Sequence, residues 1–341
     1  MQLRKPVLES SEIVETREFR AMVKRARPKP TVVFQSYWEF AAERQNIFFK
    51  RMDNTLGPWT DNPILRQYKF TNAFRVSDRV SQFLVSNVIY SGSQAPEDLL
   101  YRIMLFKLFN KIETWEMLER EIGELTWASH NFQKLNTALT KAIEGGKTIY
   151  SSAYIMPSGS SSFGSCRKHE NHLRLIELMM KDRLWEKMQA ATSMEAAYKL
   201  ILSYPTIGSF LAYQYLIDLN YSNLTLFDEM EFVVPGPGAR DGIAKCFSDR
   251  GGYSESDIIQ MMAETQDEHF DKFDLKFKDL FGRKLQLIDC QNLFCEIDKY
   301  SRVAHPEVAG LSGRTRIKQS HRPRYQSIAY KFPPKWNLST R

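Results

Sequence analysis

The sequence predicts a mainly α-helical protein made of two packed helical lobes. Apolar residues recur three and four positions apart over most of the chain, the spacing that lines one face of a helix. These segments begin at helix-start residues such as Pro96-Glu97-Asp98 and end at breakers such as 57–63, which holds one glycine and two prolines. At 341 residues with 43% hydrophobic composition, the chain can bury the core of one large domain or of two lobes.

The expected helices share this periodicity. They cover residues 36–56, 71–89, 96–112, 113–123, 129–144, 169–191, 193–202 and 239–247. Ser36, three residues before Glu39, is the expected N-cap of the first helix. Residues 149–166 interrupt the pattern with a short strand and a serine- and glycine-rich loop. The run 145–148, Gly-Gly-Lys-Thr, is similar to a nucleotide-binding loop, but Lys141 stands where that motif needs its first glycine, so a helix-ending glycine pair is expected.

Composition excludes several classes of protein. No stretch approaches the roughly 20 uncharged apolar residues of a membrane helix. Residues 1–30 lack the apolar core of a secretory signal, so a cytoplasmic protein with no membrane partner is expected. The four cysteines form no CxxC pair, and His169 and His172 have only Glu170 beside them. We therefore expect no metal site and no cofactor.

Basic residues gather at the two ends of the chain. The net charge is +7, and residues 308–341 hold eight basic residues and no acidic one, interleaved with aromatic side chains. A second cluster, 24–29, lies in the basic N-terminal segment 1–30. Such clusters suit contact with DNA phosphates, whereas solvated ends that aid solubility are the alternative for each. We expect the basic C-terminal tail, 311–341, to bind nucleic acid.

A helical hairpin at about 195–220 is the segment most suggestive of DNA binding. Pro205-Thr206-Ile207-Gly208 reads as a tight turn, and Ser209 begins the next helix. The first backbone N–H groups of a helix have no partner within it and favour an anion such as a DNA phosphate. Thr206, Gly208 and Ser209 are therefore candidate phosphate contacts, and an ordinary helix–helix turn is the alternative.

An aspartate follows this hairpin at a suggestive distance. Asp228 lies twenty residues after Gly208, which resembles the helix-hairpin-helix DNA glycosylases, where a catalytic aspartate occupies that place. The resemblance implies a glycosylase-like domain over 31–310, with Asp228 as the catalytic carboxylate. Phe210 stands where bifunctional glycosylases carry a lysine, which implies a monofunctional hydrolase with water as nucleophile. Glu231 and Asp241 are the alternative acids.

Further motifs carry a narrower resemblance over most of the chain. They are residues 43–47 (ERQNI), 58–65 (PWTDNPIL), 68–75 (YKFTNAFR), 78–79 (DR), 153–154 (AY), 232–239 (FVVPGPGA) and 289–300. Together they resemble the α-glutamyl/putrescinyl thymine pyrophosphorylase family, which includes the helical domain of phage 5-hydroxymethyluracil DNA kinases and antiviral glycosylases. The resemblance implies action on hypermodified bases of phage DNA. The kinase members carry a separate nucleotide-binding domain with no counterpart in this sequence, so phosphorylation is not expected.

A flipped base requires a pocket of aromatic and polar side chains. The candidates are Trp59, Tyr68, Phe70, Asn72, Arg75 and Tyr154. Asn72 and Arg75, three apart at a helix start, are expected to face the same way. The alternative is that the aromatic residues are core and that Arg75 pairs with Asp78 at the surface.

A second phosphate contact is expected after the turn 235–238, Pro-Gly-Pro-Gly. The helix that follows this turn presents Gly238, Arg240 and Lys245 as the candidate contacts. A purely structural elbow is the alternative.

These features predict a DNA N-glycosylase. It would excise a hydroxymethylated or glucosylated hydroxymethyl-pyrimidine from double-stranded phage DNA, as a monomer and in anti-phage defence, and leave an abasic site. One alternative is a base-hypermodification enzyme that acts on hydroxymethyluracil-derived bases. Another is a DNA-binding protein without catalytic activity.

Overall fold

The structure is a computed structural model that describes residues 25–54, 56–323, 325 and 329–338. The described chain is mainly α-helical, as predicted. Its α-helices are α1 (Val32–Asp53), α2 (Pro63–Gln67), α3 (Arg79–Phe83), α4 (Pro96–Phe109), α5 (Ile112–Ile122), α6 (Phe132–Glu144), α7 (Ser160–Phe163), α8 (Lys168–Lys181), α9 (Leu184–Ala190), α10 (Met194–Leu202), α11 (Ser209–Asn220), α12 (Pro237–Cys246), α13 (Glu255–Glu264), α14 (Gln266–Lys272) and α15 (Leu287–Ala304).

Shorter elements complete the chain. They are the 3₁₀ turns η1 (Arg75–Ser77) and η3 (Pro334–Trp336), the π-helical turn η2 (Leu84–Ile89), and the strands β1 (Lys29–Pro30) and β2 (Phe247–Asp249). The two strands pair antiparallel and attach the start of the described chain to the end of α12. The other residues of the expected basic segment 1–30, up to position 24, lie outside the described part.

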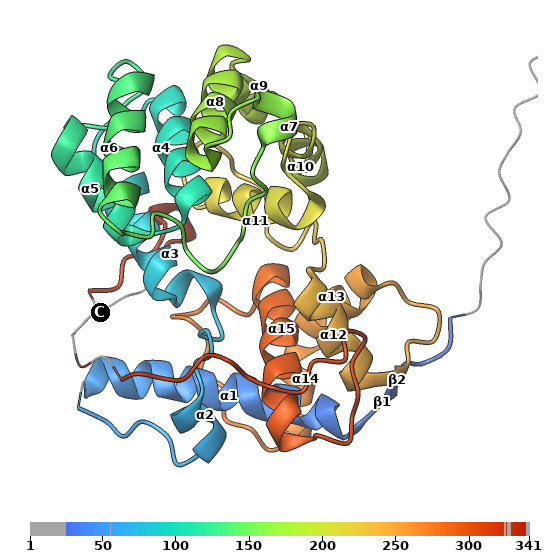
Figure 1. The fold of residues 1–341 in the computed structure, drawn as a ribbon. Helices are drawn as coiled ribbons and strands as arrows, with labels where there is room; N and C mark the ends of the chain where they lie inside the picture. Colours follow the sequence, from blue (N-terminus) through green and yellow to red (C-terminus); the bar gives the residue numbers. More distant parts are fainter. Residues whose placement is uncertain (1–24, 55, 324, 326–328, 339–341) are drawn as a thin grey trace, which may run out of the picture.

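The helices fall into two groups (Figure 1). The first lobe holds α1, α2 and α12 to α15, so it joins the beginning of the chain to its last third. The second lobe holds α4 to α11, and η1 and α3 lie between the lobes. Buried apolar side chains form a continuous core through both groups. No helix in the part of the chain that the structure describes is long and apolar enough to cross a membrane.

Two glycines of α12 allow it to lie against α15. A Cβ atom at Gly242 would lie 1.9 Å from the carbonyl oxygen of Phe294, and one at Gly238 would lie 2.4 Å from the sulfur of Cys295. At Gly242 the obstacle is backbone, which cannot rotate away, so glycine permits this approach of the two helices. Gly238, expected to approach a phosphate, instead faces a neighbouring helix.

Several predicted helix boundaries differ from the structure. α1 starts at Val32 because the hydroxyl of Thr31 accepts a hydrogen bond from the Val33 amide, and Ser36 lies inside the helix and bonds His305. The helix expected over 71–89 is divided into η1, α3 and η2. The helix expected over 169–191 is two helices, because Arg183 adopts a left-handed conformation with φ 52°. No strand forms over the described residues 149–166, which hold only the short helix α7.

The described part of the C-terminal tail contacts both lobes. In the first lobe the Lys69 amide donates to Gln319, and the His321 amide donates to the Gln67 carbonyl. Farther on, the Lys331 amide donates to the Gln82 side chain, between the lobes. The segment then reaches the second lobe, where the Lys335 ammonium donates to the carbonyls of Ser222 and Thr225.

Aromatic residues anchor the end of this tail. Phe332 is buried, and the Arg283 guanidinium lies 3.9 Å from the ring centre of Trp336. We refer to the described residues of this segment, 317–323, 325 and 329–338, as the strap, because they contact both lobes. The basic side chains at 314, 316, 318 and 322 remain exposed.

Candidate functional site

The predicted hairpin is formed by α10 and α11. Ser193 caps α10 by accepting a hydrogen bond from the Ala196 amide, and the turn 203–208 leads directly into α11. Thr206 occupies the turn with φ 70°, a conformation unfavourable for a β-branched residue. Gly208, the N-cap of α11, is exposed, a Cβ atom there would meet nothing within 4 Å, and no side chain caps the helix. The start of α11 is therefore open to a ligand.

A cluster of buried charges lies behind this hairpin. Arg75 of η1 makes a bidentate ion pair with Asp218 of α11, with N–O distances of 2.7 and 3.0 Å. The ammonium of Lys107 in α4 lies 2.9 Å from the second oxygen of the same carboxylate. One carboxylate thus serves two cations.

The pKa shifts in this cluster follow from burial and pairing. Burial would raise the pKa of Asp218, but Arg75 and Lys107 hold it below its ordinary value. Burial lowers the pKa of Lys107, and Asp218 opposes that shift. Arg75 also donates to Gln214, which in turn donates to Gln291 of α15. The charge cluster is therefore connected by hydrogen bonds to the first lobe.

Two half-buried aromatic rings lie beside the charges. Tyr154 and Phe210 stack with ring centres 5.8 Å apart and planes inclined by 15°. The Lys107 ammonium lies 4.6 Å from the centre of the Tyr154 ring. Burial raises the pKa of the Tyr154 hydroxyl, and Arg75 opposes that shift. A side chain at Gly236 would lie 2.7 Å from the Phe210 ring, so this glycine leaves room for the stack.

The predicted base-pocket residues separate into two places. Arg75 and Tyr154 belong to the cluster described above, but Arg75 is 2% exposed and uses its guanidinium in pairing with Asp218. Asn72 faces the first lobe, where its amide oxygen accepts from Arg44 and its amide nitrogen donates to Ser77. Asn72 and Arg75 therefore do not face the same way. The expected helix start is absent there because Asn72 and Asp78 make side-chain hydrogen bonds to the backbone.

The aromatic candidates of the first lobe lie apart from Tyr154. Phe70 packs against Phe40 and Tyr300 in the core. The backbone of Tyr68 forms an isolated antiparallel β-bridge with Ser320 of the strap. Trp59 is half-buried, packs obliquely on Tyr325 and lies 5.6 Å from the guanidinium of Arg51.

The three candidate acids each contact backbone amides. Asp228 is exposed and accepts from the Met230 amide at 2.9 Å. Glu231 accepts from the amide of Met194, at the start of α10. Asp241 accepts from the amide of Ser312, just before the strap, and its pKa is lowered: burial opposes this shift, and the hydrogen bonds from Ser312 cause it. None of the three lies in the buried charge cluster.

The candidate phosphate contacts on α12 differ from one another. Arg240 is exposed and available to a ligand. Lys245 is 2% exposed, and its ammonium lies 3.0 Å from the carboxylate of Asp298 in α15. A lysine held in this way joins two helices, so the structure places it away from any phosphate.

The sequence reasoning missed the most deeply buried charges. Lys107 lies in the run Leu-Phe-Lys-Leu-Phe, and Asp218 in the run Leu-Ile-Asp-Leu-Asn. A single charge within an apolar helix almost always requires a buried partner, so these runs held a usable signal. Neither run could name its partner, because Lys107 and Asp218 are distant in sequence.

Further buried carboxyl groups have raised pKa values. Burial raises the pKa of Glu229 to about 7, although Arg283 lies 3.1 Å away and opposes the shift. Burial likewise raises the pKa of Asp78 to about 7 and that of Asp289 to about 6. Asp289 accepts from the Arg75 amide, so it helps to position η1.

The two histidines that stand three residues apart at the start of α8 bond other side chains and a carbonyl. His169 bonds Asn136 and Thr140, and His172 bonds Tyr150 and the Pro157 carbonyl. No group of three or more His, Cys, Asp or Glu side chains that could hold a metal ion occurs within the described residues.

This helical fold, with its open hairpin and buried charge cluster, belongs to the 5-hmdU DNA kinase helical-domain family, which matches residues 31–310. A similar protein is the 5-hmdU DNA kinase of Bacillus phage SP10, 27% identical over 288 residues that cover 78% of this chain. The chain spans 45% of the length of that relative. No solved structure matches.

These comparisons correct the expected activity. Both matches name a kinase acting on 5-hydroxymethyluracil in DNA, and a kinase transfers a group where a glycosylase hydrolyses the bond between base and sugar. The expectation of a monofunctional DNA N-glycosylase, with an abasic product and a part in anti-phage defence, is therefore wrong. The catalytic role given to Asp228 depended on that activity. The family fits the alternative, base hypermodification.

Proposed function

We propose that this chain binds DNA containing 5-hydroxymethyluracil, or a base made from it, and takes part in the further modification of that base. The family match over 31–310 carries the proposal. The modification that the relative's name indicates is phosphorylation of the base. The proposal places recognition of the base in this chain and does not require the chain to bind the phosphate donor.

The hairpin and the aromatic pair support this proposal. The open start of α11 offers backbone N–H groups to a DNA phosphate. Phe210, on the first turn of α11, carries the stack with Tyr154, so a phosphate held there lies one helical turn or less from an aromatic surface. The Lys107 ammonium beside the Tyr154 ring places a cation on this side of the hairpin, which favours the approach of the polyanionic backbone.

We therefore assign Tyr154 as the stacking surface for the base. Aromatic stacking of an unpaired base contributes about 1 to 3 kcal/mol. Arg75, Lys107 and Asp218 act through Tyr154 by fixing its position and its electrostatic surroundings. Gly208 and Ser209 are the proposed phosphate contacts, with Arg240 as a second contact on α12.

Binding to matched duplexes tests the assignment. Fluorescence anisotropy is used to compare duplexes that differ only in one 5-hydroxymethyluracil replacing thymine. We expect the wild-type chain to bind the modified duplex more tightly and Tyr154→Ala to lose most of that preference, whereas Tyr154→Phe keeps it. Tyr253→Ala, which removes a half-buried ring from the loop before α13, serves as the control. Equal affinity of the wild-type chain for both duplexes would contradict the proposal.

The fate of the base tests the reaction class. DNA containing 5-hydroxymethyluracil is incubated with the chain, ATP and Mg²⁺, alone and together with a lysate of phage-infected cells, then digested to nucleosides for mass spectrometry. We expect no free base to be released in either incubation, and the modified nucleoside to be converted to a heavier one when the chain and the lysate are combined. Release of free base would argue for excision instead.

A further inference from the structure

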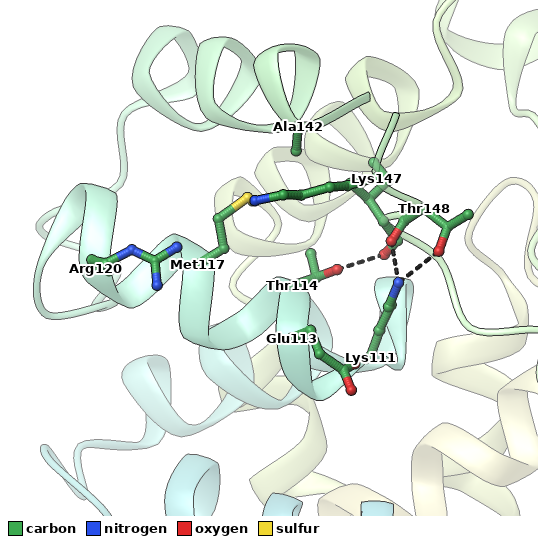
Figure 2. A pocket seen from close by; sticks show the side chains of 9 residues that line it. Lys111, Glu113, Thr114, Met117, Arg120, Ala142, Lys147 and Thr148 are labelled. Carbon is green, nitrogen blue, oxygen red and sulfur yellow. Dashed lines mark hydrogen bonds between the residues drawn. The ribbon is translucent and has the colours of Figure 1, made fainter. Parts of the chain in front are cut away.

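A pocket in the second lobe lies apart from the proposed base site. It has a volume of about 380 Å³ and lies between α5, the end of α6 and the segment that follows α6 (Figure 2). This volume is within the range of small-ligand pockets, roughly 300 to 1,000 Å³. The run Gly-Gly-Lys-Thr at 145–148 supplies part of its wall through Lys147 and Thr148.

Three cationic side chains line this pocket. They are Lys111, Arg120 and Lys147, against the single acidic residue Glu113. None of the three pairs with a carboxylate among the described residues. Lys147 reaches across the pocket toward Met117, and Glu113 points away from it (Figure 2). The pocket therefore has positive charge that the fold leaves uncompensated.

One of these cations is held in place by the loop. The Lys111 ammonium donates to the Thr148 hydroxyl at 2.7 Å and also to the Thr148 carbonyl (Figure 2). The buried hydroxyl of Thr114 donates to the Ile149 carbonyl at 2.9 Å. Two hydrogen-bonded contacts thus fix the loop against α5, so the pocket wall is formed before any ligand binds.

Three apolar side chains also line the pocket. Ala142 and Ile149 are buried, and Met117 is half-buried with its thioether facing the pocket (Figure 2). A methionine side chain makes favourable contacts with flat aromatic groups. An apolar floor beside unpaired cations suits a ligand that has a flat ring system at one end and phosphate at the other.

We propose that this pocket binds a phosphate-bearing small molecule of the mononucleotide class. The phosphate contacts Lys147 and Arg120, and the base packs on Met117 and Ile149. The loop that forms the wall continues to Tyr150, which stacks on Phe109, and then to Tyr154. The site goes beyond the proposed function and does not depend on it, because it uses none of the residues assigned to the modified base.

Calorimetric titration of the full chain tests the site. The probes are AMP, ATP and inorganic phosphate. We expect AMP and ATP to bind. Lys147→Gln and Arg120→Gln should each lower the affinity for both nucleotides by about fivefold or more, since each removes a charged hydrogen-bond donor. Lys141→Gln is the matched control, because Lys141 is an exposed lysine of α6 that does not line the pocket.

A substitution in the apolar floor of the pocket tests the contacts of the base independently of those of the phosphate. Met117→Gln keeps the side-chain length. It should lower the affinity for AMP and leave the affinity for inorganic phosphate unchanged. The proposal is overturned if the wild-type chain binds none of the three probes at millimolar concentration, or if the charge variants bind them like the wild type. It is also overturned if Lys147→Gln and Arg120→Gln lower only the affinity for duplex DNA, because the cations would then contact a DNA backbone.

Discussion

Glu229 shows at the scale of one residue how burial controls a charge. It is 5% exposed, and burial raises its pKa from 4.5 to about 7 even though Arg283 is beside it. The ion pair lies under Trp336 of the strap, whose ring contacts the same arginine. A carboxyl group in this setting changes its charge near neutral pH, so the stability of the fold depends on pH there.

The sign of that dependence follows from the direction of the shift. Because the folded pKa is higher than the unfolded one, the stabilisation from Glu229 is present below about pH 4.5 and is lost as the pH rises through about 7. We expect the wild-type chain to lose stability relative to Glu229→Gln over that interval. Urea unfolding of both chains at several pH values measures the difference.

A carboxylate elsewhere provides the comparison. Glu144 is exposed at the end of α6, and Glu144→Gln is the control because it removes a carboxylate that the fold does not bury. Profiles of equal slope for the wild-type chain and Glu229→Gln would show that this carboxyl group is not responsible.

The pair α12 and α15 shows how one missing side chain determines the packing of an element. Gly242 lies where any Cβ atom would overlap the backbone of Phe294, and a backbone atom cannot rotate away. Gly242→Ala therefore forces the helices apart. We expect it to lower the free energy of unfolding by about 3 kcal/mol, the upper part of the usual range for an overpacked core. Chemical denaturation measures this directly.

The same helix offers a control. Ala244 is half-buried on α12, and Ala244→Ser also adds one heavy atom. We expect Ala244→Ser to lower the free energy of unfolding by much less than Gly242→Ala does. Similar losses for the two variants would mean that α12 tolerates little change at any position and that the close approach is not special.

Elements with local signals were predictable, and those set by distant partners were not. Ser193 before α10 and the Pro-Glu-Asp start of α4 mark their helices, and both helices begin where expected. The break at Arg183 has no glycine or proline to announce it. In the site, the family motif indicates Tyr154, whereas no local pattern identifies the pairing of its neighbours Lys107 and Asp218, which joins α4 to α11.

At the scale of the whole molecule, the basic tail combines two roles that the sequence could not separate. Its apolar end packs on the fold through Phe332 and Trp336, which is structural. Its exposed basic side chains precede that end and are free to contact phosphates. Removing the tail as a whole would therefore change stability and charge together.

Charge substitutions measure the contribution of the tail to DNA binding without removing its packed end. A chain with Arg314, Arg316, Lys318 and Arg322 all changed to Gln keeps the packed end and loses four exposed cations. We expect weaker DNA binding and a salt dependence flatter by about one unit of slope for each phosphate that no longer has a cation beside it, because pairing with a phosphate releases counterions. Affinity measured over a series of salt concentrations gives the slope. An unchanged slope with an unchanged melting temperature would remove the tail from the DNA-binding surface.

The course of the strap along both lobes also affects the order in which the molecule is completed. During synthesis the second lobe, α4 to α11, leaves the ribosome as one continuous stretch, whereas α1 must wait for α12 and α15 before its lobe can close. The strap emerges later still, and its contacts with Gln67, Gln82 and Ser222 form last. A nascent chain stalled before residue 317 would thus hold two lobes that share a core but lack the contacts of the strap.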